Sequence, residues 1–193
     1  MLTPANAFEA VAVVSGLAYV LLILARNRWG WVCGAISSMI YVVIAARARL
    51  PMQSVLQAYY VVMAVYGWIS WTRNAEEQEG RIFRWPLRRH LLAIALILTV
   101  SLLSARLLAT ETRAAWPLLD SLTTWTSFLA TWLVARSVLE NWCYWIAADI
   151  IMVFLFMRQG YLPTAGLFTS YIIVALFGFR AWLARYRQQQ QQP

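Results

Sequence analysis

The sequence predicts an all-α integral membrane protein with seven transmembrane helices. Of its 193 residues, 62% are hydrophobic and only 12% are charged, whereas an ordinary soluble domain is about half apolar and about a quarter charged. The apolar residues fall into runs of about 17 to 20, the length that crosses roughly 30 Å of hydrocarbon. These runs are 8–25, 30–46, 54–71, 91–107, 118–135, 141–158 and 163–183.

The first run, 8–25, is expected to stay in the mature chain. Its leader, MLTPANAFEA, carries Glu9 and no positive charge, whereas a cleaved signal peptide begins with a basic segment. At the other end, the tail RYRQQQQQP has no apolar content to bury. Residues 185–193 are therefore predicted to be disordered.

The basic residues predict the orientation in the membrane. All 16 Lys and Arg residues are arginines, and they lie between the apolar runs or near the ends of the runs. The side predicted to be cytoplasmic, by its excess of arginine, holds Arg26, Arg28, Arg73, Arg81, Arg84, Arg88, Arg89, Arg136, Arg180, Arg185 and Arg187. The other side holds Arg47, Arg49, Arg106, Arg113 and Arg158. The N-terminus is thus predicted outside and the C-terminus inside, and the net charge of +8 reports topology instead of a nucleic-acid partner.

Catalytic and metal-binding groups are scarce in the sequence. Cys33 and Cys143 fall within apolar runs without a Cys or His at metal-ligand spacing, so both are expected to be buried free thiols. His90, the one histidine, lies at a membrane edge. No acid pair and no Gly-x4-Gly-Lys-[Ser/Thr] motif for an ATP motor are found. No metal, cofactor or enzymatic activity is predicted.

Two parts of the chain resemble each other. Both start with Asn-x3-Trp, both have Leu-Pro before the next run, and both end with Tyr-x5-aromatic-Gly-x3-Trp. The matched residues are Asn27, Trp31, Leu50, Pro51, Tyr60, Tyr66, Gly67 and Trp71 in one copy and Asn141, Trp145, Leu162, Pro163, Tyr171, Phe177, Gly178 and Trp182 in the other. The offset drifts from 114 positions at Asn27 and Asn141 to 111 at Trp71 and Trp182.

This duplication predicts two parallel three-helix repeats joined by a linker helix. Transporters built from parallel repeats bind their substrate between the halves near the midplane. The predicted boundaries are 1–72 for the first repeat, 73–113 for a loop and linker helix, 114–184 for the second repeat and 185–193 for the tail. The glycine of each Gly-x3-Trp permits close helix approach, and Trp71 and Trp182 are expected to anchor the helices at the membrane interface.

Polar and aromatic residues form stripes within the apolar runs. Asn141, Trp145 and Asp149 recur every four residues and so share one helical face. An ionisable group near the bilayer centre costs roughly 2.5 kcal/mol or more, so this face is not expected to meet lipid. The positions expected to face lipid or core are Ile146, Ile150, Val153 and Phe154. A second stripe, at spacings of three and four, comprises Gln57, Tyr60, Ala64, Trp68 and Trp71 in the third run. The seventh run adds Thr169, Ser170 and Tyr171.

Such a site offers aromatic faces, amide groups and little formal charge. Arginine is absent from the middle of the runs, and a phosphorylated ligand would need arginine or lysine there. Aromatic faces also attract cations. We therefore expect an uncharged or cationic small molecule with a ring and hydroxyl groups. The role of Asp149 stays open between binding a cation or hydroxyl, bracing a tyrosine and coupling protons.

At these motifs the sequence resembles the PnuC-type nicotinamide riboside transporter family. The matching segments are NWCYWIAAD, YYVVMAVYGWISW and YLPTAGLFTSYIIVALFGFRAW. The resemblance implies a fold like that of full-length SWEET proteins, a homotrimer in the bacterial inner membrane, and facilitated diffusion of unphosphorylated nicotinamide riboside. It also implies that a cytoplasmic kinase traps the imported riboside. The implied substrate contacts are Gln57, Asn141, Trp145 and Thr169.

The predicted binding mode combines both lines of reasoning. The ribose hydroxyls bond to Gln57, Asn141 and Thr169, and the ring stacks on Trp145 or on Tyr60 or Trp68, with Asp149 and Tyr171 as further site residues. Members of the family are thought to carry thiamine, riboflavin or deoxynucleosides as well, and these alternatives stay open. From another class, a non-transporting scaffold subunit is the alternative, but a scaffold gains nothing from polar stripes.

Overall fold

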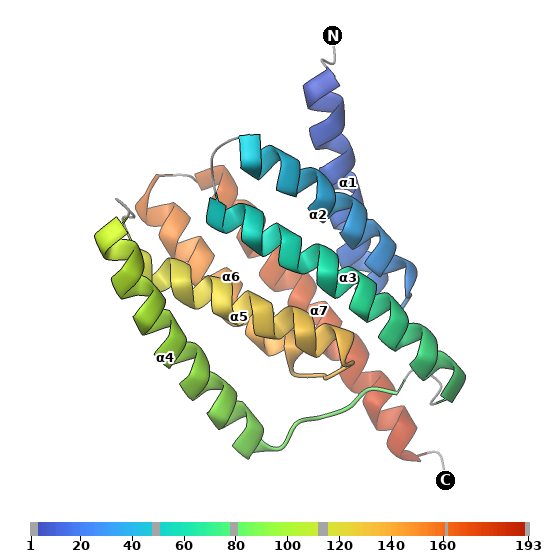
Figure 1. Cartoon of the computed structure of the whole chain (residues 1–193). Coiled ribbons are helices and arrows are strands. Elements are labelled where there is room, and N and C mark those ends of the chain that lie inside the picture. Colours follow the sequence, from blue (N-terminus) through green and yellow to red (C-terminus); the bar gives the residue numbers. More distant parts are fainter. Residues whose placement is uncertain (1–3, 48–50, 78–80, 112–115, 161, 192–193) are drawn as a thin grey trace. The chain divides into compact units, whose positions relative to one another are not determined.

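The computed structural model describes residues 4–47, 51–77, 81–111, 116–160 and 162–191. Within these ranges the chain forms seven helices (Figure 1), which confirms the predicted all-α fold. They are α1 (Pro4–Leu24), α2 (Trp29–Arg47), α3 (Pro51–Glu77), α4 (Leu87–Glu111), α5 (Pro117–Ala135), α6 (Asn141–Arg158) and α7 (Leu162–Gln191). Leu50, Arg49 and Arg113, which the sequence analysis uses, lie outside the described residues.

Several helices extend beyond the apolar runs that predict them, and α1 already begins at Pro4 instead of residue 8. α3 continues to Glu77, and α4 begins at Leu87 instead of residue 91. α7 continues through Gln191, so residues 185–191 are helical although the sequence predicts a disordered tail. Gln189 gives part of the physical reason, because its Oε1 accepts a hydrogen bond from the Ile82 N–H at 3.1 Å.

Internal packing divides the chain into two units. Unit 1 comprises Met1–Arg81 and Val134–Ser137, and unit 2 comprises Ile82–Leu133 and Val138–Pro193. Unit 1 thus contains α1, α2 and α3 with the last residues of α5, and unit 2 contains α4, most of α5, α6 and α7. The helix predicted as a linker, α4, packs as part of unit 2, and the repeat boundaries stay a prediction.

In unit 1, α2 packs against both α1 and α3. Glycines allow these close contacts, because a Cβ on Gly34 would lie 2.8 Å from Cδ2 of Tyr19. A Cβ on Gly67 would overlap the indole of Trp31. The Ser37 hydroxyl, which lies in the contact between α1 and α2, donates to a carbonyl of α1 at 2.8 Å. Polar and apolar groups are therefore both accommodated where these helices meet.

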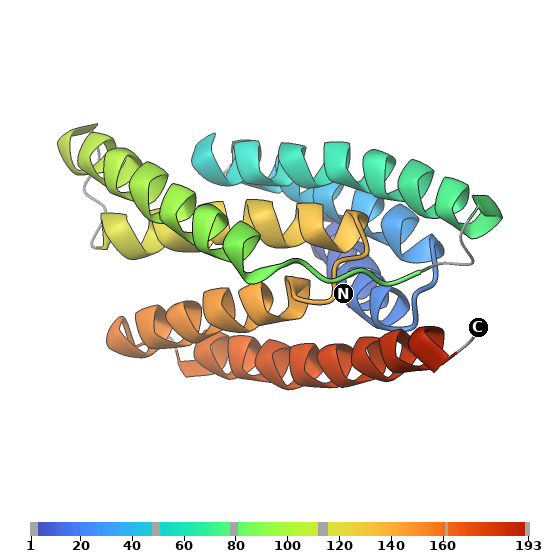
Figure 2. The ribbon, with the colours of Figure 1, turned by 90° about the horizontal axis from the view of Figure 1, so that it is seen from below.

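In unit 2, α6 and α7 lie side by side (Figure 2). Gly178 permits this approach, since a Cβ there would lie 2.6 Å from the ring of Trp142. α4 contacts α5 through Trp125, whose Nε1 donates to the Ser104 hydroxyl at 3.0 Å. The core of the unit is built from Ala130, Leu133, Val138 and Tyr144, with Trp85, Ile97, Leu129, Trp132 and Trp145 packed against them.

The two repeats have the same backbone turn after their first helix. Arg26 follows α1 and Ser137 follows α5, and both take a left-handed conformation, with φ of 62° and 58°. These two residues are 111 positions apart. In the first copy the N–H of the next residue, Asn27, donates to a carbonyl five residues earlier at 2.8 Å, and in the second copy Val138 does the same at 2.9 Å. A left-handed residue with this long backbone bond is a common way for a helix to end.

This turn fixes the register of the duplication at 111 positions. Asn27 therefore corresponds to Val138, and Asn141 corresponds to Gly30. The predicted pairing of Asn27 with Asn141, at an offset of 114, is wrong. The physical reason is that the backbone turn sets where the second helix of each repeat begins, and the asparagines occupy different positions relative to it.

The prediction that Trp71 and Trp182 anchor the helices at the interface is also wrong. Trp71 is 4% exposed and Trp182 is 0% exposed. Each packs inside its own unit, where the Trp71 Nε1 donates to the Val134 carbonyl at 3.2 Å. The two cysteines are free, but Cys143 is exposed and Cys33 half-buried, so the prediction of a buried thiol is wrong for Cys143.

Length and composition identify several membrane-crossing helices among the described residues. The segments Leu87–Leu107, Asn141–Arg158 and Ala165–Gln191 are long and apolar enough to span a bilayer. Ala10–Leu24 and Trp29–Ile44 are shorter apolar helices. Most of the large side chains of α4 are exposed, including Leu91, Leu92 and Leu96, as expected of a helix that meets lipid.

Candidate substrate-binding site

The candidate residues of α6 lie on its buried face. Asn141 is 0% exposed and Asp149 is 7% exposed, and Trp145, between them in the stripe, is half-buried. On the other side of the helix, Ile150 and Phe154 are exposed. The periodicity of the sequence therefore separates the two faces of α6 as predicted.

Asn141 has one satisfied and one unsatisfied end. Its Nδ2 donates to the Val138 carbonyl at 2.7 Å. Its Oδ1 is buried and has no hydrogen-bond partner within the part of the chain that the structure describes. A buried acceptor left unpaired costs about 1–3 kcal/mol, so this oxygen is suited to a donor that a ligand supplies.

Asn27 has a different role. Its Oδ1 accepts a hydrogen bond from the Trp29 N–H at 3.0 Å, and it precedes the first turn of α2. A side-chain oxygen that accepts from the first turn of a helix is an N-cap. The two asparagines that the sequence analysis pairs thus differ in function as well as in position.

Trp145 combines a packed face with an accessible one. It packs against the core cluster that contains Ala130 and Tyr144, and it is half-buried. One side of the indole is therefore fixed by the protein. A ring held in this way presents a rigid aromatic wall, and such a wall attracts flat or cationic ligands.

The candidate residues of α7 belong to the helix that packs against α6 in unit 2, where Thr169 is exposed and Tyr171 is half-buried. The Thr169 hydroxyl donates to the Ala165 carbonyl of its own helix at 2.9 Å, which leaves its oxygen able to accept. Tyr171 meets Phe168 edge-on, with 5.7 Å between ring centroids, and Phe168 stacks on Phe156 at 5.5 Å. Phe156 and Phe168 are not among the predicted site residues, although the three-residue spacing of Phe168 and Tyr171 places these two on one helical face.

The remaining candidates lie on α3 in unit 1. Gln57 and Tyr60 are half-buried, and the Tyr60 ring lies 6.1 Å from that of Tyr59. Trp68 meets Trp29 at 5.2 Å, and the Arg28 guanidinium carbon lies 5.4 Å from its ring centroid. Trp68 therefore sits beside the start of α2, and its ring already has aromatic and cationic neighbours.

Comparison with known proteins places this fold in a family. The family model described as "Nicotinamide mononucleotide transporter" matches residues 6–184. The chain is 25% identical to the nicotinamide riboside transporter PnuC of Escherichia coli, over 94% of this chain and 87% of the relative. It is 26% identical to the riboflavin/roseoflavin transporter RibM of Streptomyces davaonensis, over 93% and 86%.

The fold also matches a solved structure. A crystal structure of the vitamin B3 transporter PnuC superposes with a TM-score of 0.75 at 21% identity, and the match covers 96% of this chain and 84% of that one. Together these matches confirm the resemblance found at the sequence motifs and a multi-pass membrane transporter. The protein belongs to the nicotinamide mononucleotide transporter family, as a transporter of the PnuC type.

Proposed function

We propose that this transporter carries nicotinamide riboside by facilitated diffusion. The observation that carries the proposal is the buried Oδ1 of Asn141, which lacks a partner among the described residues and shares a helical face with the half-buried Trp145. A hydroxyl that donates to this oxygen would remove the cost of the unpaired acceptor. The 25% identity to a nicotinamide riboside transporter over most of the chain supports the same substrate.

The proposed contacts divide the substrate into two parts. The ribose hydroxyls bond to Asn141, Gln57 and Thr169, and the cationic pyridinium ring stacks on Trp145 or on Tyr60. Attraction between a cation and an aromatic face is worth about 0.5–2 kcal/mol, with the larger value where both are desolvated. Asp149, on the same face of α6 as Asn141 and Trp145, and Tyr171 of α7 complete the proposed site.

The proposal also covers the direction of net transport, the orientation of the chain in the membrane and its oligomeric state. Net import follows if a cytoplasmic kinase phosphorylates the riboside, because no arginine lies near the middle of the helices to accept the product. The excess of arginine on one side supports a cytoplasmic C-terminus and an outside N-terminus in the bacterial inner membrane. A homotrimer is the assembly that the resemblance implies.

The experiment is equilibrium binding by the purified, detergent-solubilised protein. The panel is nicotinamide riboside, its mononucleotide, nicotinamide, thiamine and riboflavin. We expect the riboside to bind, and we expect Asn141→Ala to weaken its binding about tenfold, equivalent to about 1.4 kcal/mol. Asn27→Ala is the matched control, because it removes an asparagine that caps a helix, and its affinity should equal that of the wild type.

Asn141→Gly is a second variant, since it installs the residue that the first repeat has at this position, Gly30. Wild-type affinity in both Asn141 variants would exclude Asn141 as a contact. Absence of binding to every compound of the panel would overturn nicotinamide riboside as the proposed substrate.

Riboflavin is the second candidate substrate. The relative RibM is described as a riboflavin/roseoflavin transporter and is 26% identical to this chain, about as similar as the nicotinamide riboside transporter. An isoalloxazine ring also stacks on aromatic faces, and its ribityl chain carries hydroxyl groups. Binding of riboflavin without nicotinamide riboside in the same panel would replace the substrate while leaving the family unchanged.

A further inference from the structure

The first turns of α2 and α6 are held by different means. α2 has the local cap from Asn27, but the matching residue before α6 is Val138, whose side chain has no oxygen to accept a bond. Glu140, which directly precedes α6, makes no side-chain cap either. The first N–H groups of α6 bond to nearby backbone carbonyls instead, since Asn141 donates to Val138 at 3.2 Å and Cys143 donates to Glu140 at 3.0 Å. The turn that supplies these carbonyls is itself in contact with another part of the chain.

That part is the segment Ile82–Pro86, which we call the strap. The strap runs along the turn between α5 and α6 (Figure 2). Phe83 pairs with Val138 in an isolated parallel bridge, and the Leu139 N–H donates to the Phe83 carbonyl at 2.9 Å. The far end of the strap is fixed by the bond from Ile82 to Gln189 of α7.

Glu140 is the side chain that ties the strap to α6. Its Oε1 accepts from Arg84 Nε at 2.7 Å, and its Oε2 accepts from the Trp85 N–H at 3.3 Å. Hydrogen bonds to an ionised partner are roughly twice as strong as neutral ones. The hydrogen bond to Glu140 raises the pKa of the Arg84 guanidinium. Arg84 is half-exposed, and this moderates the strength of the pair.

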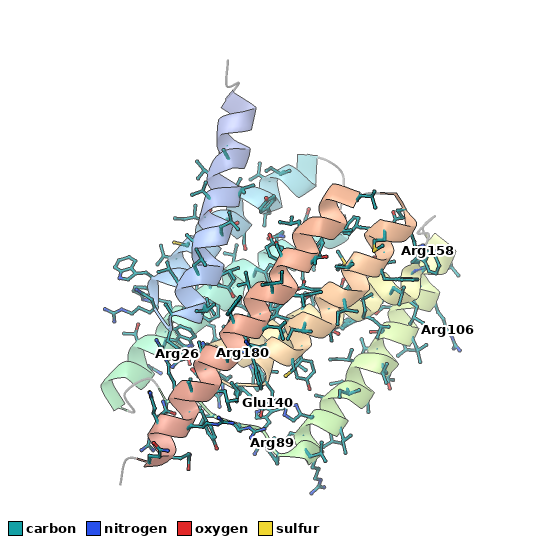
Figure 3. All side chains as sticks on the ribbon, turned by 180° about the vertical axis from the view of Figure 1, so that it is seen from behind. Arg26, Arg89, Arg106, Glu140, Arg158 and Arg180 are labelled. Atoms are coloured by element: carbon teal, nitrogen blue, oxygen red, sulfur yellow. The ribbon has the colours of Figure 1, made fainter. Side chains whose placement is uncertain are left out.

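His90 extends the same contact to the next turn of α6. Its Nδ1 lies 3.0 Å from the Tyr144 hydroxyl, and its Nε2 lies 4.0 Å from Oε2 of Glu140. The ring packs beside Trp85, with 5.5 Å between centroids. Figure 3 shows Glu140 at the end of unit 2 where α4 begins, near Arg89, whereas Arg106 and Arg158 lie at the other ends of α4 and α6.

The residues that contact the strap also contact, or directly precede, Asn141 of the candidate site. The Asn141 amide is oriented by its bond to the Val138 carbonyl, and Val138 is the residue that the strap pairs with. Glu140 is the residue next to Asn141. The direction in which the unpaired Oδ1 points therefore depends on the strap, which lies more than fifty positions earlier in the sequence.

We infer that Glu140 is a positioning residue, which acts through the strap to hold Asn141 in its binding orientation. This inference rests on the proposed function for the role of Asn141. The first repeat needs no such device, because its counterpart of Asn141 is Gly30, which has no side chain to orient. The strap is thus an addition to the second repeat, where the binding stripe lies.

The test measures ligand affinity and local opening in the full-length protein. Glu140→Ala removes both hydrogen bonds between Glu140 and the strap, and Arg84→Gln removes the ionic one. Arg89→Gln is the matched control, since it removes a neighbouring exposed arginine. Amide hydrogen exchange over residues 139–145 reports on the first turn of α6. In a Cys33→Ala background, the labelling rate of the exposed Cys143 reports on the same turn.

We expect Glu140→Ala and Arg84→Gln to raise the rates of hydrogen exchange and of Cys143 labelling about threefold or more. Both variants should also weaken nicotinamide riboside binding about tenfold, because loss of a hydrogen bond to a charged group has an effect of this size. Glu140→Gln, which keeps an acceptor oxygen and the shape of the side chain, should recover part of the affinity, and Arg89→Gln should change nothing. If hydrogen exchange and labelling are unchanged in both Glu140→Ala and Arg84→Gln, the inference is overturned, because the strap then does not hold the turn.

A second outcome also overturns it: faster exchange with wild-type affinity, because Asn141 is then oriented without the strap. Failure of the proposed function looks different, since the wild type itself then binds no nicotinamide riboside. In that case exchange and labelling still decide whether the strap holds α6, and riboflavin serves as the probe of affinity if it is the compound that binds.

Discussion

The packing centres of the two repeats are nearly identical, whereas the stripes beside them differ. In the first repeat, Trp31 packs onto Gly67 and meets Trp71 edge-on, at 5.5 Å and 84°. In the second repeat, Trp142 packs onto Gly178 and meets Trp182 at 5.7 Å and 90°. The indole nitrogens of Trp31 and Trp142 are both buried without a partner among the described residues. The duplicated unit has kept its way of packing.

The stripe on the second helix of each repeat has changed. The residues of α6 that form it are Asn141, Trp145 and Asp149, and their counterparts on α2 are Gly30, Gly34 and Ser38. The α2 residues are small and allow α1 to approach. Packing alone therefore does not require a large polar stripe in this architecture. This difference supports the proposal that the α6 stripe binds a ligand in addition to any role in packing.

In one helix–helix contact, the large residue and the small residue exchange places between the two repeats. In the first, a large Tyr19 on α1 packs on the small Gly34 of α2. In the second, the position of Tyr19 is taken by the small Ala130 and that of Gly34 by the large Trp145, which packs against the cluster containing Ala130. The aromatic ring is thus supplied by the first helix in one repeat and by the second helix in the other.

Substitution of the buried tryptophans tests whether the two packing centres are equivalent, and it should change stability the most. Trp31→Ala and Trp142→Ala each remove a buried indole, and each should lower the free energy of unfolding by about 3–5 kcal/mol. Trp29→Ala is the control, because Trp29 is exposed, and it should cost much less. The measurement is unfolding in detergent followed by far-UV circular dichroism. A large loss for only one of the two buried tryptophans would contradict the equivalence.

A somewhat smaller effect is expected at the glycines that receive the tryptophans. Gly67→Ala and Gly178→Ala place a methyl group against an indole, and overpacking of this kind costs about 1–3 kcal/mol. Gly166→Ala is matched to them, because it lies in α7 with open space around it. A helical glycine in the open is less favourable than alanine by about 0.5–1 kcal/mol, so this variant should be slightly more stable. Equal stability of all three variants in thermal unfolding would show that the close approach is not needed.

The fold was predictable because its signals are local and periodic. Long apolar runs identify the helices, and Gly67 and Gly178 mark the close approaches. The register of the repeat was not predictable in the same way, since it depends on left-handed Arg26 and Ser137. Neither residue type favours that conformation, so no sequence signal marks the turn. Trp71 and Trp182 pack edge-on against Trp31 and Trp142, and this tertiary contact is not visible in the spacing of the motif.

The candidate site was predictable only in part. Four-residue spacing identifies the buried face of α6, because helical periodicity relates sequence to burial directly. The unpaired oxygen of Asn141 depends on the direction of the Val138 carbonyl, which a sequence does not reveal. The tie between Arg84 and Glu140 joins residues 56 positions apart, and no periodic pattern connects such positions.

The contact in which the large and small residues exchange places is expected to give an effect of intermediate size on stability. Gly34→Trp should clash with Tyr19, and Tyr19→Ala should leave a cavity, so each alone destabilises unit 1. The double variant reproduces the arrangement of the second repeat, and we expect a favourable coupling of about 1–2 kcal/mol between the two changes. Unfolding free energies of the wild type, both single variants and the double variant give this coupling. Strict additivity would mean that the introduced indole does not use the space that Tyr19 leaves.

The smallest effect concerns the two helix starts. Asn27→Ala removes the cap of α2 and should cost about 0.5–2 kcal/mol, nearer the lower value because Asn27 is exposed. Val138→Ala, at the matching position, removes no cap, and any cost there comes from lost packing in a core residue. Hydrogen exchange separates the two causes: Asn27→Ala should speed exchange at the first turn of α2 alone, since its bond to Trp29 is local. If the first turn of α2 stays protected without Asn27, its start is held by tertiary packing, and the contrast with the strap-held start of α6 loses its basis.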